Sequence, residues 1–213
     1  MDSNKSKILS TEPLDASEAR WTGLIKTTYI DPNGVKRTWE HARRPTRPAG
    51  SKIDGVGIVA ILRNRPGQGS DEPTILLQKQ FRPPTTRICI EHPAGLIDPN
   101  ETPEECALRE LKEETGYVGE VIGDGAGFVM FNDPGFCDTN LQMVHIQVDM
   151  SLPTNQNPTP QLEDNEFIEC FEVPLKDLYT ECLRLEKEGY GIDARVGTMA
   201  EGLELARRWA VFK

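Results

Sequence analysis

The residues with the clearest chemical potential are three glutamates in one short segment. Glu110, Glu113 and Glu114 lie within five consecutive positions, and spacings of three and four bring side chains together on an α-helix. Like charges at these spacings destabilise a helix by about 0.2–0.5 kcal/mol per pair. Carboxylate oxygens are also the ligands that hard divalent cations prefer. The cluster is therefore either a solvated acidic face or a site where a cation offsets the repulsion.

The segment 103–115 carries the signals of a helix that would position these carboxylates. Thr102 can cap the first turn, Pro103 suits the first helical position, and Glu105 can complete a capping box. Gly116 is typical of a helix end. Apolar side chains recur at intervals of three and four between these limits, so we expect one face of the helix to pack on a sheet.

A longer pattern surrounds the glutamates. Gly95 is followed after five residues by Glu101, and after seven more by the run RELKEETGY at 109–117. This pattern resembles the signature of the Nudix family, G-x5-E-x7-R-E-U-x-E-E-x-G-U, where U is an apolar residue. Tyr117 is the one departure, because the family more often has an aliphatic residue there. The resemblance implies a Nudix-type α/β/α sandwich with a mixed sheet.

The resemblance also implies a metal site. Glu110 and Glu114 would bind the metal, Glu113 would be a further or water-mediated ligand, and the loop before the helix would turn the backbone carbonyl of Ala94 toward the metal. Ligation by oxygen alone suits Mg²⁺ or Mn²⁺.

Arg109 and Glu101 have different expected roles. Helical spacing predicts that Arg109 points away from the three carboxylates, toward the outer side of the helix. The resemblance implies that Arg109 orients the glutamates by ion pairing, Glu101 included. Alternatively, Glu101 is a favourably placed charge just before the N-terminus of a helix.

The elements that must hold this helix follow from apolar periodicity and turn residues. The clustered and alternating order of these elements favours an α/β sandwich of the α+β class over a doubly wound sheet. Strands are predicted at 55–63, 74–81, 88–91, 127–131, 143–148 and 167–172, and further helices at 175–188 and 199–211.

The chain before the first of these strands is expected to form an appendage. We predict a flexible tail at 1–18 without a secretion or import signal, and a β-hairpin subdomain with its linker at 19–50. The hairpin strands are predicted at 21–30 and 35–41, and the Nudix domain would occupy 51–213.

Segments outside the signature resemble the ADP-ribose pyrophosphatase branch of the family, the ADP-sugar hydrolases. The resemblance covers nearly the whole chain from Trp21 onward. The segments that carry it are Arg37-Thr38-Trp39-Glu40, Gln80-Phe81-Arg82-Pro83-Pro84, residues 90–98 and Asp133-Pro134-Gly135.

Two tryptophans are candidates for the adenine site. Trp21 and Trp39 fall on opposite strands of the expected hairpin, where they could sandwich an adenine or form a cross-strand pair that staples the hairpin. The resemblance favours stacking. It also implies that the hairpin is exchanged in a homodimer, so that one subunit's tryptophan completes the other's pocket.

Four polar residues would bind the rest of the substrate. Arg82 and Arg44 are candidates for the diphosphate, since guanidinium groups match phosphate oxygens, although Arg44 could equally be a solvated charge of the linker. Glu40 would accept a hydrogen bond from the adenine amino group, or is a surface carboxylate. Asp133 is assigned to the substrate site by resemblance alone.

Hydrolysis also needs a general base. The resemblance implies a base on a loop beyond the signature, and 161–167 is the long polar loop there that carries carboxylates. Glu166 is our candidate and Glu163 the fallback. The alternative is that both residues only solubilise the loop.

The expected reaction is hydrolysis of ADP-ribose, or of other ADP-sugars, to AMP and ribose 5-phosphate. A Nudix hydrolase of an oxidised nucleotide or a dinucleotide, or a non-hydrolytic nucleotide sensor, are the alternatives.

Composition narrows the partners and the location. The net charge of −10 argues against a nucleic-acid backbone as partner, and no apolar run approaches a membrane span. Five cysteines without a CxxC pair predict reduced thiols in an intracellular protein, in the cytoplasm or also in the nucleus. The scattered His41, His92 and His145 are predicted to be structural or surface residues.

Overall fold

The two apolar runs GVGIVAILR and TILLQKQF form neighbouring strands in the middle of one sheet, β3 (Gly55–Arg63) and β4 (Thr74–Arg82). The computed structural model describes residues 6–67 and 72–211, and in it most side chains of β3 are buried. Strands covered on both faces have continuous apolar sequences rather than alternating ones. The predicted positions of both strands are confirmed.

The sheet has eight strands and mixed pairing. Its order is β10-β5-β4-β3-β8-β7, with β6 paired to β3 and β9 paired to β4. β3 runs parallel to β8, whereas β4 is antiparallel to β5 and β9. The other elements are β1 (Gly23–Ile30), β2 (Lys36–Arg43), β5 (Arg87–Glu91), β6 (Ala94–Leu96), α1 (Pro103–Thr115), β7 (Glu120–Phe131), β8 (Asn140–Asp149), β9 (Ile168–Pro174), α2 (Leu178–Lys187), β10 (Gly191–Ile192), α3 (Ala194–Arg208) and the short 3₁₀ helices Pro83–Thr85, Pro153–Asn155 and Leu175–Asp177.

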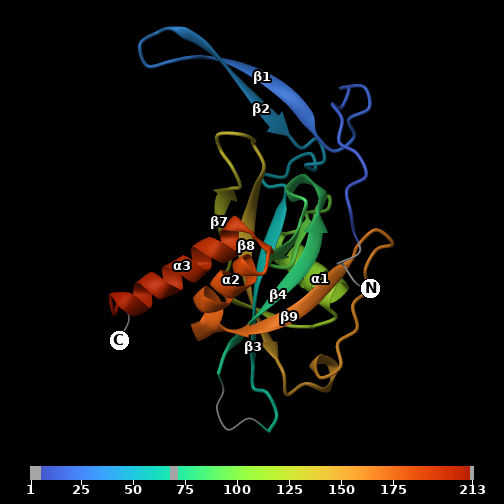
Figure 1. Cartoon of the computed structure of the whole chain (residues 1–213), viewed down its shortest axis with the longest axis vertical. Helices are drawn as coiled ribbons and strands as arrows, with labels where there is room; N and C mark the ends of the chain where they lie inside the picture. The colour runs from blue at the N-terminus through green and yellow to red at the C-terminus, as the bar shows by residue number, and fades with distance from the viewer. Residues whose placement is uncertain (1–5, 68–71, 212–213) are drawn as a thin grey trace.

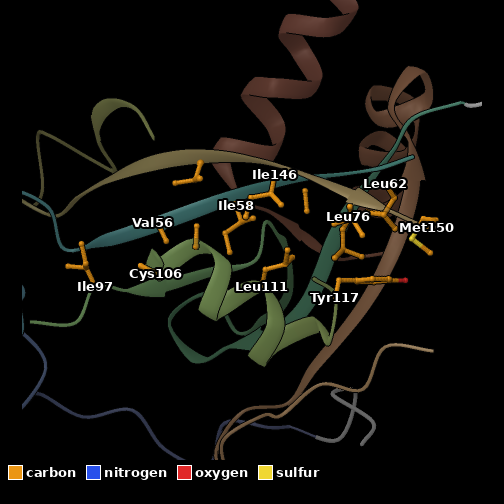
Figure 2. Close-up of a cluster of buried hydrophobic side chains, with 14 of the residues drawn as sticks. Val56, Ile58, Leu62, Leu76, Ile97, Cys106, Leu111, Tyr117, Ile146 and Met150 are labelled. Atoms are coloured by element: carbon orange, nitrogen blue, oxygen red, sulfur yellow. The ribbon is translucent and has the colours of Figure 1, made fainter. Parts of the chain in front are cut away.

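Helices cover both faces of the sheet, which makes the α/β/α sandwich that the sequence predicts (Figure 1). On one face, Leu111 of α1 packs with Ile58 of β3 and Ile146 of β8. Figure 2 shows these side chains between the helix and the sheet. On the other face, α2 and α3 pack over Val59 and Ile75. Successive side chains of a strand point to opposite faces, so β3 contributes to both cores.

The sheet divides at one end, and this division creates the place for the glutamate helix. β3 and β4 pair only at Ile61–Ile75 and Leu62–Thr74. Toward its N-terminus, β3 pairs instead with β6, whose Leu96 carbonyl accepts a hydrogen bond from the Cys106 thiol of α1 at 3.4 Å. The loop that carries Gly95 therefore lies directly against α1.

Several boundaries differ from the predicted ones. β7 begins at Glu120 instead of 127, and its register to β8 shifts twice, so periodicity does not mark the first half. α3 begins at Ala194 instead of 199, because Asp193 caps it by accepting a hydrogen bond from the backbone N–H of Arg195. The two- and three-residue strands β10 and β6 were not predicted, since so few residues show no periodicity.

The hairpin of β1 and β2 forms its own two-stranded sheet beyond one end of the sandwich (Figure 1). It contacts the segment 133–138. The backbone N–H of Ala42 donates to the Phe136 carbonyl at 2.8 Å, and Arg43 pairs with Asp138 at 2.7 Å. Residues 1–5 of the predicted tail lie outside the described residues. Among the described residues, no helix has the length and hydropathy needed to cross a membrane.

Candidate active site

The glutamate helix α1 begins and ends where the sequence predicts. The Thr102 hydroxyl accepts from the backbone N–H of Glu105 at 3.2 Å, and the Glu105 carboxylate accepts from the N–H of Thr102 at 2.9 Å. Gly116 ends the helix at a φ of 77°, a conformation that favours glycine. Because Leu111 is buried against the sheet, the register of the helix directs Glu110 and Glu114 toward the β6 loop.

Gly95 is the contact that brings Glu110 to this loop. A methyl group on Gly95 would lie 1.9 Å from the carboxyl carbon of Glu110, far inside van der Waals contact. Glycine is needed here for the close approach of the carboxylate. The structure thus explains why the first position of the signature is a glycine.

We therefore expect Gly95→Ala to displace Glu110 and to weaken binding of divalent cations roughly 10-fold or more, as loss of ligand orientation typically does. The fold should survive, because only the carboxylate at the end of a flexible side chain has to move. Mn²⁺ titration measures the first effect and circular dichroism the second. Gly127→Ala is the matched control, since an added methyl there meets its nearest neighbour only at 3.4 Å. Unchanged Mn²⁺ affinity in Gly95→Ala would contradict the expectation.

Glu114 is the most deeply buried of the three glutamates. One carboxylate oxygen of Glu114 accepts a hydrogen bond from the backbone N–H of Ala94 at 3.0 Å. Ala94 and Glu114, both predicted to bind the metal, are therefore in direct contact. Burial raises the pKa of Glu114 to about 8, and the negative charges of Glu110 and Glu166 act in the same direction. Burial likewise raises the pKa of Glu110, which the hydrogen bond from Arg109 opposes. In this buried environment, Glu110 and Glu114 can both be ionised only if a positive charge lies close to them.

Arg109 does not point away from the carboxylates, so that prediction is wrong. Its guanidinium makes two hydrogen bonds to Glu101, at 2.8 and 3.0 Å, and further ones to Glu110 at 2.8 Å and Glu113 at 3.1 Å. Side chains of a helix lean toward its N-terminus, and that is where Glu101 lies. The ion pairing of Arg109 with the glutamates is present in the structure, and it lowers the pKa of Glu101.

The residues present fit a hard divalent cation. In the ranges 6–67 and 72–211, no group of three His, Cys, Asp or Glu side chains is arranged to hold a metal ion. In this structure the Glu110 carboxylate is instead paired with Arg109. The donors that face the Ala94 loop are nevertheless all oxygens. Beside Glu114 lies the buried amide of Gln78, whose oxygen and nitrogen have no hydrogen-bond partner among the described residues. An amide buried without a partner costs about 1–3 kcal/mol, which a hydrated cation would recover.

A cavity of about 300 Å³ opens next to these residues. On one side it is lined by the β6 residues 94–96, and around it stand the side chains of Arg44, Arg82 and Arg195. Two of these arginines are held by carboxylates. Arg82 makes two hydrogen bonds to Glu91, at 2.8 and 2.6 Å, and Arg195 makes two to Asp193, at 2.7 and 2.8 Å.

Arg44 has no ion pair within the described part of the chain, so its charge is free to meet an anion. Both arginines predicted for the diphosphate, Arg44 and Arg82, thus line one cavity. Arg195 was missed by the sequence reasoning. Its place depends on the parallel pairing of β10 with β5 and on a hydrogen bond from Asp193 N–H to the Ile90 carbonyl at 3.0 Å. No local sequence signal reports these contacts.

The loop 161–167 brings Glu166 to the buried carboxylates. The backbone N–H of Gln161 donates to the Glu113 carbonyl at 2.7 Å, which holds the loop on α1. Glu166 accepts from the N–H of Glu163 at 3.0 Å. The charge of Glu166 is among the largest causes that raise the pKa of Glu110 and Glu114, whereas that of Glu163 is not. Of the two candidates for the base, Glu166 is therefore nearer the cluster.

Comparison with known proteins agrees with this geometry. Residues 53–195 match the NUDIX domain family. The chain belongs to the Nudix family. It is 51% identical to the ADP-ribose pyrophosphatase of Saccharomyces cerevisiae over 92% of this chain and 83% of that protein. It is 38% identical to the ADP-sugar pyrophosphatase of Mus musculus over 96% of this chain and 90% of that protein.

A solved structure described as an ADP compounds hydrolase shares the fold of this Nudix protein. The TM-score is 0.55 at 23% sequence identity, and the match covers 94% of this chain and 91% of that chain. With the family established, the helix α1 and the Gly95 loop are the Nudix signature of a hydrolase, in which all the carboxylates of the pattern are present.

The predicted tryptophan pair is not formed within one chain of this Nudix hydrolase. Trp39 lies opposite Thr27 in the hairpin, while Trp21 precedes the first residue of β1. The indole N–H of Trp39 donates instead to the Gly135 carbonyl at 3.0 Å. A cross-strand staple is therefore excluded. The side chains of both tryptophans are more than half exposed, at 66% for Trp21 and 52% for Trp39.

The remaining predicted residues lie outside the arginine-lined cavity. Glu40 is exposed on β2 opposite Lys26, and Asp133 is exposed at the start of the segment that contacts the hairpin. Among the histidines, His92 is buried, and burial lowers its pKa to about 4. His41 shares a hydrogen bond with Thr27 at 3.0 Å, and His145 is exposed.

Proposed function

We propose that this Nudix hydrolase cleaves the diphosphate of ADP-ribose, and of related ADP-sugars, to AMP and ribose 5-phosphate, with Mg²⁺ as its cofactor. The observation that carries the proposal is the cavity in which Arg44, Arg82 and Arg195 stand around the β6 loop that touches Glu110 and Glu114. A diphosphate placed there would meet cationic side chains and the metal-binding carboxylates together. The names and the high identity of the yeast and mouse relatives support an ADP-linked substrate.

The chemistry follows from the groups around the cavity. Mg²⁺ held by Glu110, Glu114 and the carbonyl of Ala94 would supply charge neutralisation and a lower pKa for bound water. Glu166 accepts the proton of the water that attacks one phosphorus atom. The bond to the bridging oxygen breaks, and the two phosphate products leave. Arg82 and Arg195, oriented by Glu91 and Asp193, balance the charge on the phosphate oxygens.

The test is a product-resolved assay with Mg²⁺ over ADP-ribose, ADP-glucose, diadenosine phosphates and NADH. We expect the highest kcat/KM with ADP-ribose and equal amounts of AMP and ribose 5-phosphate. A preference for diadenosine phosphates or NADH would replace the proposed substrate. Tight nucleotide binding without turnover, in the presence of Mg²⁺ or Mn²⁺, would identify a sensor instead.

We also propose a homodimer in which the hairpins are exchanged and each adenine site takes a tryptophan from both subunits. The exposed apolar side chains of the hairpin support it, since Leu24 and Ile30 are 88% and 72% exposed in one chain. Large exposed apolar patches mark interfaces. Sedimentation velocity tests the dimer, and a monomer at micromolar concentration would contradict it. An intracellular location, in the cytoplasm or also in the nucleus, is supported by the five free thiols and is tested by cell fractionation.

Loss of one stacking ring should mainly affect substrate binding. We expect Trp21→Ala to raise KM for ADP-ribose roughly 10-fold, which corresponds to about 1.4 kcal/mol of lost stacking, with a smaller change in kcat. Trp209→Ala is the matched control, because Trp209 is also exposed but lies at the end of α3, away from the hairpin. Equal KM values for the two variants would remove Trp21 from the adenine site.

A further inference from the structure

Gln78 is a buried polar side chain that directly follows an apolar run in β4. It follows Ile75, Leu76 and Leu77 in β4 and is 1% exposed. Neither its amide nitrogen nor its amide oxygen has a hydrogen-bond partner among the described residues. Buried amides are normally bonded. The Glu114 carboxylate is an ionisable group close to it, so the amide has hydrogen-bonding capacity available both for that carboxylate and for a ligand beside it.

The surroundings of Gln78 place it beside the metal-binding helix. In the sheet it lies opposite Glu91 of β5 and Cys170 of β9, and residues directly opposite each other point to the same face. The Cys170 thiol donates to the backbone carbonyl of Glu114 at 3.8 Å. The amide is also close enough to oppose the rise in the pKa of Glu114. Gln78 thus lies between two carboxylates. One is Glu91 of β5, which binds Arg82, and the other is Glu114 of α1.

An amide at this place suits the waters of a bound cation. It offers two N–H donors and a carbonyl acceptor, so it can donate to the Glu114 carboxylate and accept from a water. Mg²⁺ usually keeps several of its waters when it binds to carboxylates. Groups that hydrogen-bond to ligands and bound waters orient the metal site. A methionine would fill the same space without a polar cost, which a purely structural position in this apolar strand would favour.

We propose that Gln78 is a positioning residue of the metal site, whose amide holds the Glu114 carboxylate and a water of the hydrated cation. The inference rests on the proposed metal-dependent function. It assigns to β4 a direct part in metal binding, in addition to α1 and the β6 loop. It also implies that the amide lowers the stability of the metal-free protein and raises its affinity for the cation.

The test compares Gln78→Met with the wild type, using the full chain without substrate. Methionine matches glutamine in length and lacks its hydrogen-bonding atoms. We expect Mn²⁺ affinity, measured from the free-ion signal in electron paramagnetic resonance, to fall about 10-fold, as expected for loss of an outer-shell partner. The thermal midpoint of the metal-free protein should be equal to that of the wild type or higher. Gln147→Met, the same change on β8 beside Ile61, should leave the affinity unchanged.

Two further variants make the result decisive. Gln78→Glu keeps oxygen atoms at the same reach and should bind Mn²⁺ more tightly than Gln78→Met. Gln78→Leu replaces Gln78→Met should the latter fail to fold. Wild-type Mn²⁺ affinity in the apolar variant would overturn the inference, as would a lower metal-free midpoint with unchanged affinity, which is the pattern of a packing role.

Failure of the proposed function gives a different result. If the wild type binds no Mn²⁺, or if Glu114→Gln binds it normally, the metal site itself is misplaced and the inference fails with it. If the wild type binds Mn²⁺ and Glu114→Gln does not, while Gln78→Met binds like the wild type, only the role of Gln78 is wrong.

Discussion

Glu114→Gln is expected to reduce Mg²⁺-dependent turnover by roughly 10³-fold or more while the fold survives. Metal ions supply several kcal/mol of transition-state stabilisation, and each 1.4 kcal/mol corresponds to a tenfold change in rate. Glutamine keeps the size of the side chain and one oxygen but removes the charge that holds the cation. Steady-state kinetics at saturating Mg²⁺, with Mn²⁺ titration alongside, measures the effect. Activity like that of the wild type would refute the assignment of Glu114 as a ligand.

The same variant has a second expected effect, on stability. In the metal-free protein the pKa of Glu114 is raised to about 8 from an ordinary value of 4.5. Between these pH values the folded state binds more protons than the unfolded state, so the free energy of unfolding falls as pH rises. The size of the loss is on the order of several kcal/mol.

Glu114→Gln should remove most of this decline, because its side chain does not ionise. Mg²⁺ should remove it in the wild type, because the cation favours the ionised form. Chemical denaturation at pH 5 and pH 8.5, with and without Mg²⁺, gives the four comparisons. Glu105→Gln is the control, since that exposed carboxylate belongs to the helix cap. A wild type whose metal-free stability rises between these pH values would contradict the account.

The parts of the site that the sequence predicts are those set by local contacts. The capping box from Thr102 to Glu105 and the glycine at 116 define α1 by interactions within the helix itself. The period of the helix then places Glu110 and Glu114 on one side. Two residues of the arginine-lined cavity were predicted, Arg82 from a segment with a family resemblance and Arg44 because a guanidinium group matches phosphate oxygens.

The parts that the sequence does not reveal depend on strand pairing. Arg195 reaches the cavity because β10 pairs with β5, more than 90 positions earlier in the chain. Gln78 stands beside Glu114 because Cys170 of β9 pairs with Gln78 of β4 and also contacts the backbone of Glu114 in α1. The direction of Arg109 was mispredicted because the helical period tells only where the side chain leaves the helix. Where the end of this long side chain lies is decided by its ion-pair partner Glu101.

The positions of the two tryptophans also depend on strand pairing, here on the register of the hairpin. Composition predicts a hairpin, and the structure contains it, but the first strand begins after Trp21, so that residue has no partner across the hairpin. The residue opposite Trp39 is Thr27, six positions beyond Trp21, so the observed register keeps the two rings apart. Both rings are exposed in the described chain, which is the arrangement that the proposed site between two subunits requires.

Glu166→Gln is expected to lower kcat by about 10²–10⁴-fold, the usual contribution of a positioned general base, without loss of Mn²⁺ binding. Glu166 lies at the end of the loop that Gln161 attaches to α1, where its charge acts on Glu110 and Glu114. Glutamine keeps the hydrogen bond to the N–H of Glu163 but cannot accept the proton of the attacking water. The acid limb of the kcat–pH profile should disappear together with the rate.

The matched control is Glu163→Gln, which removes from the same loop a carboxylate that is not among the largest influences on the buried glutamates. We expect at least half of the wild-type kcat in that variant. If Glu163→Gln loses the rate and Glu166→Gln keeps it, the two roles are exchanged. If both variants keep the rate and the pH profile, the proton of the attacking water goes to a group outside the loop.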